Sequence, residues 1–117
     1  MDKDDGKSLF LEFFGGRPFF RVVDFLLENR LQDFSKSEIA RGAGVSWATL
    51  YNHWPKLEKQ GIVKATRKVG NITLYQLNES NPLVKSMKRM ELALIERAAN
   101  AEEANAKMKV RPAQALH

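Results

Sequence analysis

The residues of this 117-residue chain that could do chemistry are few, and they do not combine into a catalytic or metal-binding pattern. The sequence has no cysteine, which excludes disulfides, thiolate nucleophiles and cysteine-ligated zinc. Its two histidines, His53 and His117, have no second histidine or carboxylate cluster at metal-ligand spacing. The glycines form neither a GxGxxG loop nor a P-loop. We therefore expect no enzymatic activity, no metal and no cofactor.

The chemistry that the sequence favours is the binding of phosphate groups. The formal net charge is +5, and residues 36–71 alone contain seven basic and two acidic side chains. Such a local excess of positive charge is typical of a surface that contacts a nucleic-acid backbone, with an ordinary solvated surface as the alternative. The cations that we expect to make such contacts are Lys36, Arg41, Lys56, Lys64, Arg67 and Lys68.

The basic segment begins in two short predicted helices joined by a glycine turn. Ser35 and Glu38 have the spacing of a capping box, so we expect a first helix that ends at Gly42 and Gly44. Ser46 predicts the cap of a second helix, inside which Pro55 predicts a kink or a break. The apolar stripe of this second helix is Leu50, Trp54 and Leu57. Its opposite face carries Trp47, Thr49, Asn52, His53 and Lys56.

Elements on both sides must position these two helices. The apolar cluster at 9–14 predicts a short helix or an extended arm, and Arg17-Pro18 predicts the start of a helix that ends near Asn29. Residues 31–34 predict a connector or a minimal strand. Residues 62–69 and 72–77 predict two strands of a basic hairpin that turns at Gly70-Asn71.

A long helix is predicted from Asn81-Pro82 to Met108. At roughly 40 Å it is too long for so small a domain. We expect its apolar seam to pack on a second copy, parallel or antiparallel, with a helix folded back on its own domain as the alternative. The predicted dimer interface consists of Leu83, Met87, Met90, Leu94, Ile95, Ala98 and Ala101.

The predicted organisation is a flexible tail at 1–8, a DNA-binding domain at 9–80, the dimerisation helix at 81–108 and a disordered tail at 109–117. Three aspartates precede the first apolar run, unlike a secretory signal, and no apolar run approaches the roughly 18 residues of a membrane span. We expect an intracellular, cytoplasmic protein.

The segment SKSEIARGAGVSWATLYNHWPKLEKQGIVKATRKVGNITLYQL resembles the winged helix-turn-helix domains of archaeal and bacterial transcriptional regulators of the MarR, ArsR and TrmB-like group. The shared features are a capped Ile-Ala helix, a Gly-Val-Ser turn, a Thr-Leu-Tyr segment, a Leu-Glu-x-x-Gly-Ile-Val exit and a basic hairpin. The resemblance extends over about residues 9–96. It implies a mainly α fold with a small β-hairpin, a winged helix-turn-helix followed by a long C-terminal helix.

The same resemblance implies that helix 46–60 enters the major groove and that wing 67–71 lies on the backbone or in the minor groove. The helix residues that match DNA contacts are Ser46, Trp47, Thr49, Tyr51, Asn52 and His53, and the wing residues are Arg67, Lys68 and Asn71. Two departures from the family pattern are Trp47, where many relatives have a polar residue, and Pro55.

The chemistry of these side chains suggests different roles. Asn52 can pair bidentately with adenine, which discriminates between bases by about 1–3 kcal/mol. Thr49 and Tyr51 can donate to phosphates, which orients the helix without selecting a sequence. Trp47 has two interpretations, stacking on a sugar or thymine methyl group or covering the helix interface as core, whereas we expect Trp54 in the core.

Three functions fit the sequence. The leading hypothesis is a homodimeric, sequence-specific transcriptional regulator of double-stranded DNA on the nucleoid, with no small-molecule effector evident. The second is an architectural or segregation protein that coats DNA with low sequence specificity. The third is a winged helix that binds another protein through the cluster of Phe10, Phe13 and Phe14 and the C-terminal helix.

Overall fold

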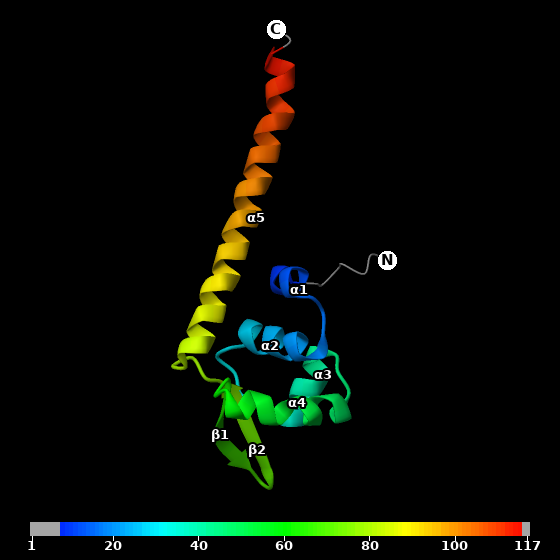
Figure 1. Cartoon of the computed structure of the whole chain (residues 1–117), viewed down its shortest axis with the longest axis vertical. Coiled ribbons are helices and arrows are strands. Elements are labelled where there is room, and N and C mark those ends of the chain that lie inside the picture. Colours follow the sequence, from blue (N-terminus) through cyan, green and yellow to red (C-terminus); the bar gives the residue numbers. More distant parts are fainter. Residues whose placement is uncertain (1–7, 116–117) are drawn as a thin grey trace.

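The computed structural model describes residues 8–115, with side chains described for 8–108. Its elements in chain order are α1 (Leu9–Phe14), α2 (Pro18–Glu28), α3 (Lys36–Ala43), α4 (Trp47–Lys59), β1 (Val63–Val69), β2 (Ile72–Leu77) and α5 (Pro82–Ala115). In Figure 1, α5 projects from one end of the molecule, while α4 and the hairpin lie at the other end. The predicted fold class is confirmed, and the segment at 9–14 is a helix. The tail predicted at 1–8 lies outside the described residues except for Ser8, which caps α1.

Local capping explains where the two central helices begin. At α3, the Ser35 hydroxyl accepts from the Glu38 amide at 3.1 Å, and the Glu38 carboxylate accepts from the Ser35 amide at 2.9 Å. Gly44 follows with a left-handed φ of 72°, which favours glycine. The capping-box prediction is therefore confirmed.

The structure corrects the prediction for Gly42, and of the two alternatives for Pro55 it excludes the break, while the kink stays a prediction. Gly42 does not end α3 but lies inside its last turn. A glycine is required there because a Cβ at this position would meet Phe25 of α2 at 2.2 Å. A glycine here allows α2 and α3 to approach each other closely. Pro55 does not break α4, which is a single helix from Trp47 to Lys59. The carbonyl that loses its helical donor belongs to Tyr51, and both residues are exposed, so water can replace that bond.

The core lies between α2, α3, α4 and the base of the hairpin. The predicted stripe of α4 is confirmed, since Leu50, Trp54 and Leu57 are buried. They pack with apolar residues of α2 and with Phe10 and Val84. Burial of such side chains supplies most of the free energy that stabilises a domain of this size.

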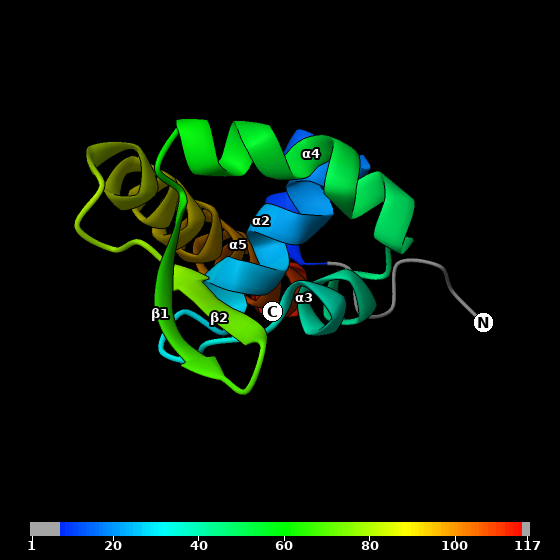
Figure 2. The same cartoon turned by 90° about the horizontal axis from the view of Figure 1, so that it is seen from below.

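The hairpin is antiparallel and carries one irregularity. Val63 pairs with Leu77 and Val69 with Ile72, and the register shifts between Ala65 and Arg67, which makes Thr66 the extra residue of a β-bulge. Phe34, in the predicted connector, forms an isolated bridge with Tyr75 of β2. The hairpin and α4 lie at the end of the molecule opposite the projecting helix (Figure 1), and Figure 2 looks onto this end.

Helix α5 is joined to the domain through Asn81. Its side chain accepts from the Leu83 amide at 2.6 Å and donates to the Gly61 carbonyl at 2.8 Å, which ties the start of α5 to the end of α4. The helix continues to Ala115, past the predicted end at Met108. The helix thus passes Pro112, which removes one helical donor without ending it, and the disorder expected for residues 109–117 stays a prediction. Within residues 8–115, no helix is long and apolar enough to cross a membrane.

A buried carboxylate lies where α1, α2 and α5 meet. Asp24 of α2 is 7% exposed, and the Ser8 hydroxyl donates to its Oδ1 at 2.7 Å. Burial raises the pKa of Asp24, and burial together with neighbouring carboxylates raises the pKa of Glu28 and of Glu91 on α5. The junction therefore holds three carboxyl groups that bind protons more readily than in water.

Candidate nucleic-acid interface

The exposed face of α4 presents two aromatic side chains and an amide. Trp47 is 51% and Tyr51 63% exposed, with ring centroids 6.3 Å apart. Asn52 is exposed on the next position along the helix. The interpretation of Trp47 as core is therefore wrong. These three side chains offer two surfaces for stacking and one group that can both donate and accept hydrogen bonds.

Two predicted contact residues, Ser46 and Thr49, are occupied in capping α4. The Ser46 hydroxyl accepts from the Thr49 amide at 3.1 Å and donates to Thr49 Oγ1 at 2.9 Å. The Ser46 hydroxyl thereby satisfies one of the free amides at the start of the helix. Thr49 is half-buried and keeps a hydroxyl hydrogen that it can donate to a phosphate.

His53 and Lys56 lie on the side of α4 that faces the start of α2. The His53 ring is 5.9 Å from the ring of Phe19, and Lys56 Nζ lies 4.3 Å above the same ring. His53 is half-buried there, whereas Lys56 is exposed. The structure therefore places Trp47 and Tyr51 side by side on the surface, exposes Asn52 farther around the helix and packs His53 beside Phe19.

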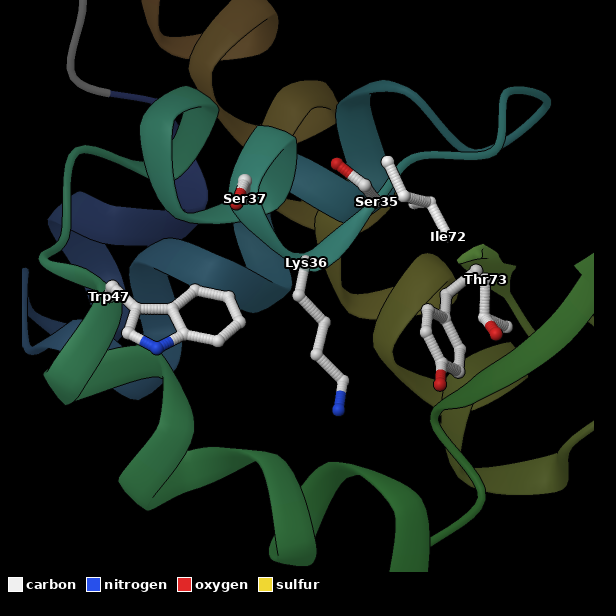
Figure 3. A pocket seen from close by; sticks show the side chains of 7 residues that line it. Ser35, Lys36, Ser37, Trp47, Ile72 and Thr73 are labelled. Atoms are coloured by element: carbon white, nitrogen blue, oxygen red, sulfur yellow. The ribbon is translucent and has the colours of Figure 1, made fainter. Parts of the chain in front are cut away.

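A groove of about 360 Å³ separates the start of α3 from β2. Figure 3 shows Lys36 projecting into it between Trp47 on one side and Thr73 on the other. Lys36 Nζ lies 5.0 Å from the ring of Trp54 and 5.7 Å from that of Tyr75. Both rings attract the ammonium group by cation–π interaction, which holds this predicted phosphate contact near α4.

The predicted wing residues are exposed, but one of them has a partner inside the protein. On the hairpin, the exposed side chains are Lys64, Lys68 and Asn71. Arg41, in the last turn of α3, is exposed as well. Arg67 donates from Nε to Asp33 Oδ2 at 3.0 Å and from Nη2 to Asp33 Oδ1 at 3.3 Å. Hydrogen bonds from Arg67 and Thr66 lower the pKa of Asp33 to about 2.

Sequence reasoning missed Asp33. It lies in the connector between α2 and α3, 34 positions from Arg67, and no local pattern links the two residues. The capping box of Ser35 and Glu38 predicts where α3 begins, but it does not predict that the hairpin packs beside the connector.

The predicted dimer interface on α5 divides into two groups. Met87 packs against the core of its own domain, next to the buried Val84, so the first turns of α5 follow the alternative of a helix folded back. Leu83, Met90 and Ile95 are exposed, as is Ala101, and Leu94 and Ala98 are half-buried. A groove of about 410 Å³ lies beside them, lined by Phe13 of α1 and by Met90, Ala93, Leu94 and Arg97 of α5.

No arrangement among residues 8–115 groups three or more histidines or carboxylates closely enough to hold a metal ion. What the exposed face of α4, the groove and the hairpin offer is hydrogen bonding, stacking and positive charge.

No protein-family model and no curated protein matches the sequence, but several solved structures match the fold. MepR, a transcription regulator of the Staphylococcus aureus multidrug efflux pump MepA, is 18% identical with a TM-score of 0.59 over 91% of this chain and 82% of MepR. A mutant of ZitR from Lactococcus lactis in the apo form is 19% identical with a TM-score of 0.58 over 83% and 74% of the two chains. The antimony-specific transcriptional repressor AntR is 25% identical with a TM-score of 0.51 over 68% of each chain.

ZitR is a zinc-responsive member of the MarR family. The fold of this chain is that of the MarR-like winged-helix regulators. The resemblance inferred from the sequence is confirmed at this level, and MepR and AntR are a transcription regulator and a transcriptional repressor.

Proposed function

We propose that the protein is a homodimeric, sequence-specific DNA-binding regulator of transcription that acts on the nucleoid in the cytoplasm. The observation that carries the proposal is the exposed face of α4. This helix exposes Trp47, Tyr51 and Asn52 and lies at the same end of the molecule as the basic hairpin (Figure 1). A helix and a basic wing side by side match the major groove and the adjacent phosphates of a duplex.

The residues of this face have distinct proposed roles. Asn52 pairs with an adenine, and Trp47 stacks on a sugar or a thymine methyl group at the start of the helix. Tyr51 and Thr49 donate to phosphates. Lys36, Arg41, Lys64 and Lys68 supply the part of the affinity that depends on salt and not on sequence.

Dimerisation through α5 is part of the proposal. Beyond its first turns, α5 leaves the domain with Met90 and Ile95 exposed and with an apolar groove shared with Phe13 (Figure 1). A second copy of the chain that covers this surface would place two copies of α4 on one duplex.

The experiment is a selection of binding sites from random duplex DNA with the purified protein, followed by titrations with two variants. Asn52→Ala is expected to reduce the preference for the selected site by about 1–3 kcal/mol at one base pair of each half-site. Lys68→Ala is expected to weaken binding to all sequences alike and to reduce the salt dependence. Asn100→Ala, which changes an exposed asparagine on α5, is the matched control.

A discrete palindromic site supports the regulator. Protection that spreads along the DNA without a preferred sequence would contradict it and would favour a DNA-coating protein. Equal loss of preference in Asn52→Ala and Lys68→Ala would contradict the assigned roles.

A further inference from the structure

The connector between α2 and α3 is attached to the hairpin at three places. The Phe34 amide donates to the Tyr75 carbonyl at 2.8 Å, and the Tyr75 amide donates to the Phe34 carbonyl at 2.7 Å. Gln76 Nε2 donates to the Arg30 carbonyl at 3.0 Å. Asp33, next to Phe34, binds Thr66 and Arg67 of β1. The connector therefore holds β2 through its backbone and β1 through one carboxylate.

The β-bulge explains how one carboxylate binds two successive side chains. In a regular strand, neighbouring side chains point to opposite faces of the sheet. The extra residue at Thr66 breaks this alternation, and Thr66 Oγ1 donates to Asp33 Oδ2 at 2.6 Å, while Arg67 donates to both carboxylate oxygens. A bulge that redirects side chains in this way is a specific feature of a strand rather than an irregularity without consequence.

Arg67 has fewer free N–H donors for a phosphate than its exposure suggests. The side chain is 63% exposed, but Nε and Nη2, one of the two donor pairs that can form a bidentate contact, already face Asp33. The paired charges also neutralise each other. Lys64 and Lys68 are exposed on the same hairpin and stand on either side of this pair along β1.

We propose that Asp33, Thr66 and Arg67 form a clasp that fixes the wing against the α2–α3 connector, and that Arg67 is a positioning residue and not a phosphate contact. The clasp sets the place of Lys68 and of the Gly70-Asn71 turn relative to α4. This inference rests on the proposed function, because the wing acts on DNA only if the protein binds DNA.

The first experiment measures the salt dependence of duplex binding between about 50 and 200 mM salt for the wild type and for single variants. Log affinity falls as log salt rises, and Lys68→Ala is expected to make this negative slope shallower by about 0.9 per bound protomer, the value of one phosphate contact. Arg67→Ala is expected to weaken binding without changing the slope. Asp33→Ala is expected to make the slope steeper by about the same 0.9 per protomer, since it frees Arg67 for a phosphate.

If Arg67→Ala makes the salt dependence of binding shallower as Lys68→Ala does, Arg67 contacts a phosphate and the proposal is wrong. An unchanged slope in Asp33→Ala would equally contradict it, because the arginine would not then be withheld from DNA by this carboxylate.

The second experiment needs no DNA. Amide hydrogen exchange of the hairpin is expected to accelerate about two- to fivefold in Asp33→Ala and in Arg67→Ala alike, and to stay unchanged in Lys68→Ala. Unchanged exchange in both clasp variants would show that the clasp does not position the wing. If the wild type binds no duplex at low salt, the proposed function fails, while the exchange measurement still decides whether the clasp exists.

Discussion

Two aspartates of this protein show how position changes the acidity of the same side chain. Asp24 is buried and its pKa is raised by the loss of water, whereas Asp33 lies beside Arg67 and Thr66 and its pKa is lowered to about 2. A raised pKa in the folded state means that stability is greatest at low pH and is lost as pH rises through that pKa. Asp33 has the opposite effect, because its contribution is lost as pH falls toward 2.

Asp24→Asn is therefore expected to make stability less dependent on pH. The amide keeps an oxygen that can accept from Ser8 but no longer has to lose a proton in a buried position. Urea unfolding between about pH 4.5 and 7.5, above the ordinary range of aspartate, measures the effect. The wild type should lose stability across this interval, and the variant should lose less.

Two other carboxyl groups near Asp24 also have raised pKa values, so the comparison needs a control. Burial raises the pKa of both Glu28 and Glu91, Glu91 raises that of Glu28 further, and Arg30 and Lys88 oppose the shift at Glu91, so a residual slope remains in the variant. Glu96→Gln removes a negative charge at an exposed position of α5. A curve for Asp24→Asn as steep as that of the wild type would show that burial of this carboxyl group does not govern the pH dependence.

Among the elements, α2 and α3 approach each other closely, and this contact depends on Gly42. A Cβ at this position would lie 2.2 Å from Cε1 of Phe25, whose ring is in turn 4.9 Å from the ring of Phe34. The aromatic ring thus has a neighbour that limits its movement away from α3. This contact fixes the helix that precedes α4, and with it the orientation of the proposed DNA-binding face.

Gly42→Ala is expected to destabilise the protein by about 1–3 kcal/mol, because overpacking outweighs the better helix propensity of alanine. Thermal unfolding measures the change. Gly16→Ala is the matched control, since a Cβ at Gly16 meets no atom within 4 Å. Equal melting temperatures for the two variants would contradict the role assigned to Gly42.

The sequence predicts an element well where the interactions that form it join residues close together in the chain. The starts of α3 and α4 follow from Ser35, Glu38 and Ser46, which bond to amides three positions away at most. The predicted break at Pro55 was wrong because a proline destabilises a helix only as far as the freed carbonyl lacks water, and exposure is a property of the fold. The role of Gly42 was also hidden, since its neighbour Phe25 belongs to another helix.

The candidate site was predictable to the same extent. The exposure of Asn52 follows from the helical period, which places it opposite Leu50, Trp54 and Leu57, whereas the exposure of Trp47, seven positions before Trp54, does not follow from that period. The contact of His53 with Phe19 and the ion pair of Arg67 with Asp33 depend on segments far apart in the chain. No local pattern carries that information.

The molecule as a whole is elongated, with principal extents of 71 × 33 × 22 Å, and α5 accounts for its length (Figure 1). Its first turns are held by Val84 and Met87 in the core and by Asn81 at the end of α4. Farther along, exposed apolar side chains such as Met90 lie beside Phe13 of α1. An isolated helix of this kind gains little stability from its own hydrogen bonds, which favours a partner along its apolar side.

Met90→Glu is expected to weaken dimerisation at least about tenfold, because a charged side chain would enter the groove that a second copy covers. Analytical ultracentrifugation over a range of concentrations measures the dissociation constant. Leu92→Glu introduces the same charge at a leucine that is 60% exposed and does not line this groove, and it should leave the dimer intact. A wild-type protein that stays monomeric at about 100 μM would contradict the proposed dimer.

The arrangement of the two tryptophans on α4 has a practical consequence for spectroscopy. These are the protein's only indole groups; Trp54 is buried in the core, and Trp47 is half exposed on the proposed DNA-binding face. The fluorescence of Trp54 therefore reports on whether the domain is folded, and quenching of Trp47 by a solute reports on whether that face is covered. One helix thus contains two optical probes that can be separated by replacing either indole with phenylalanine, without attaching any dye.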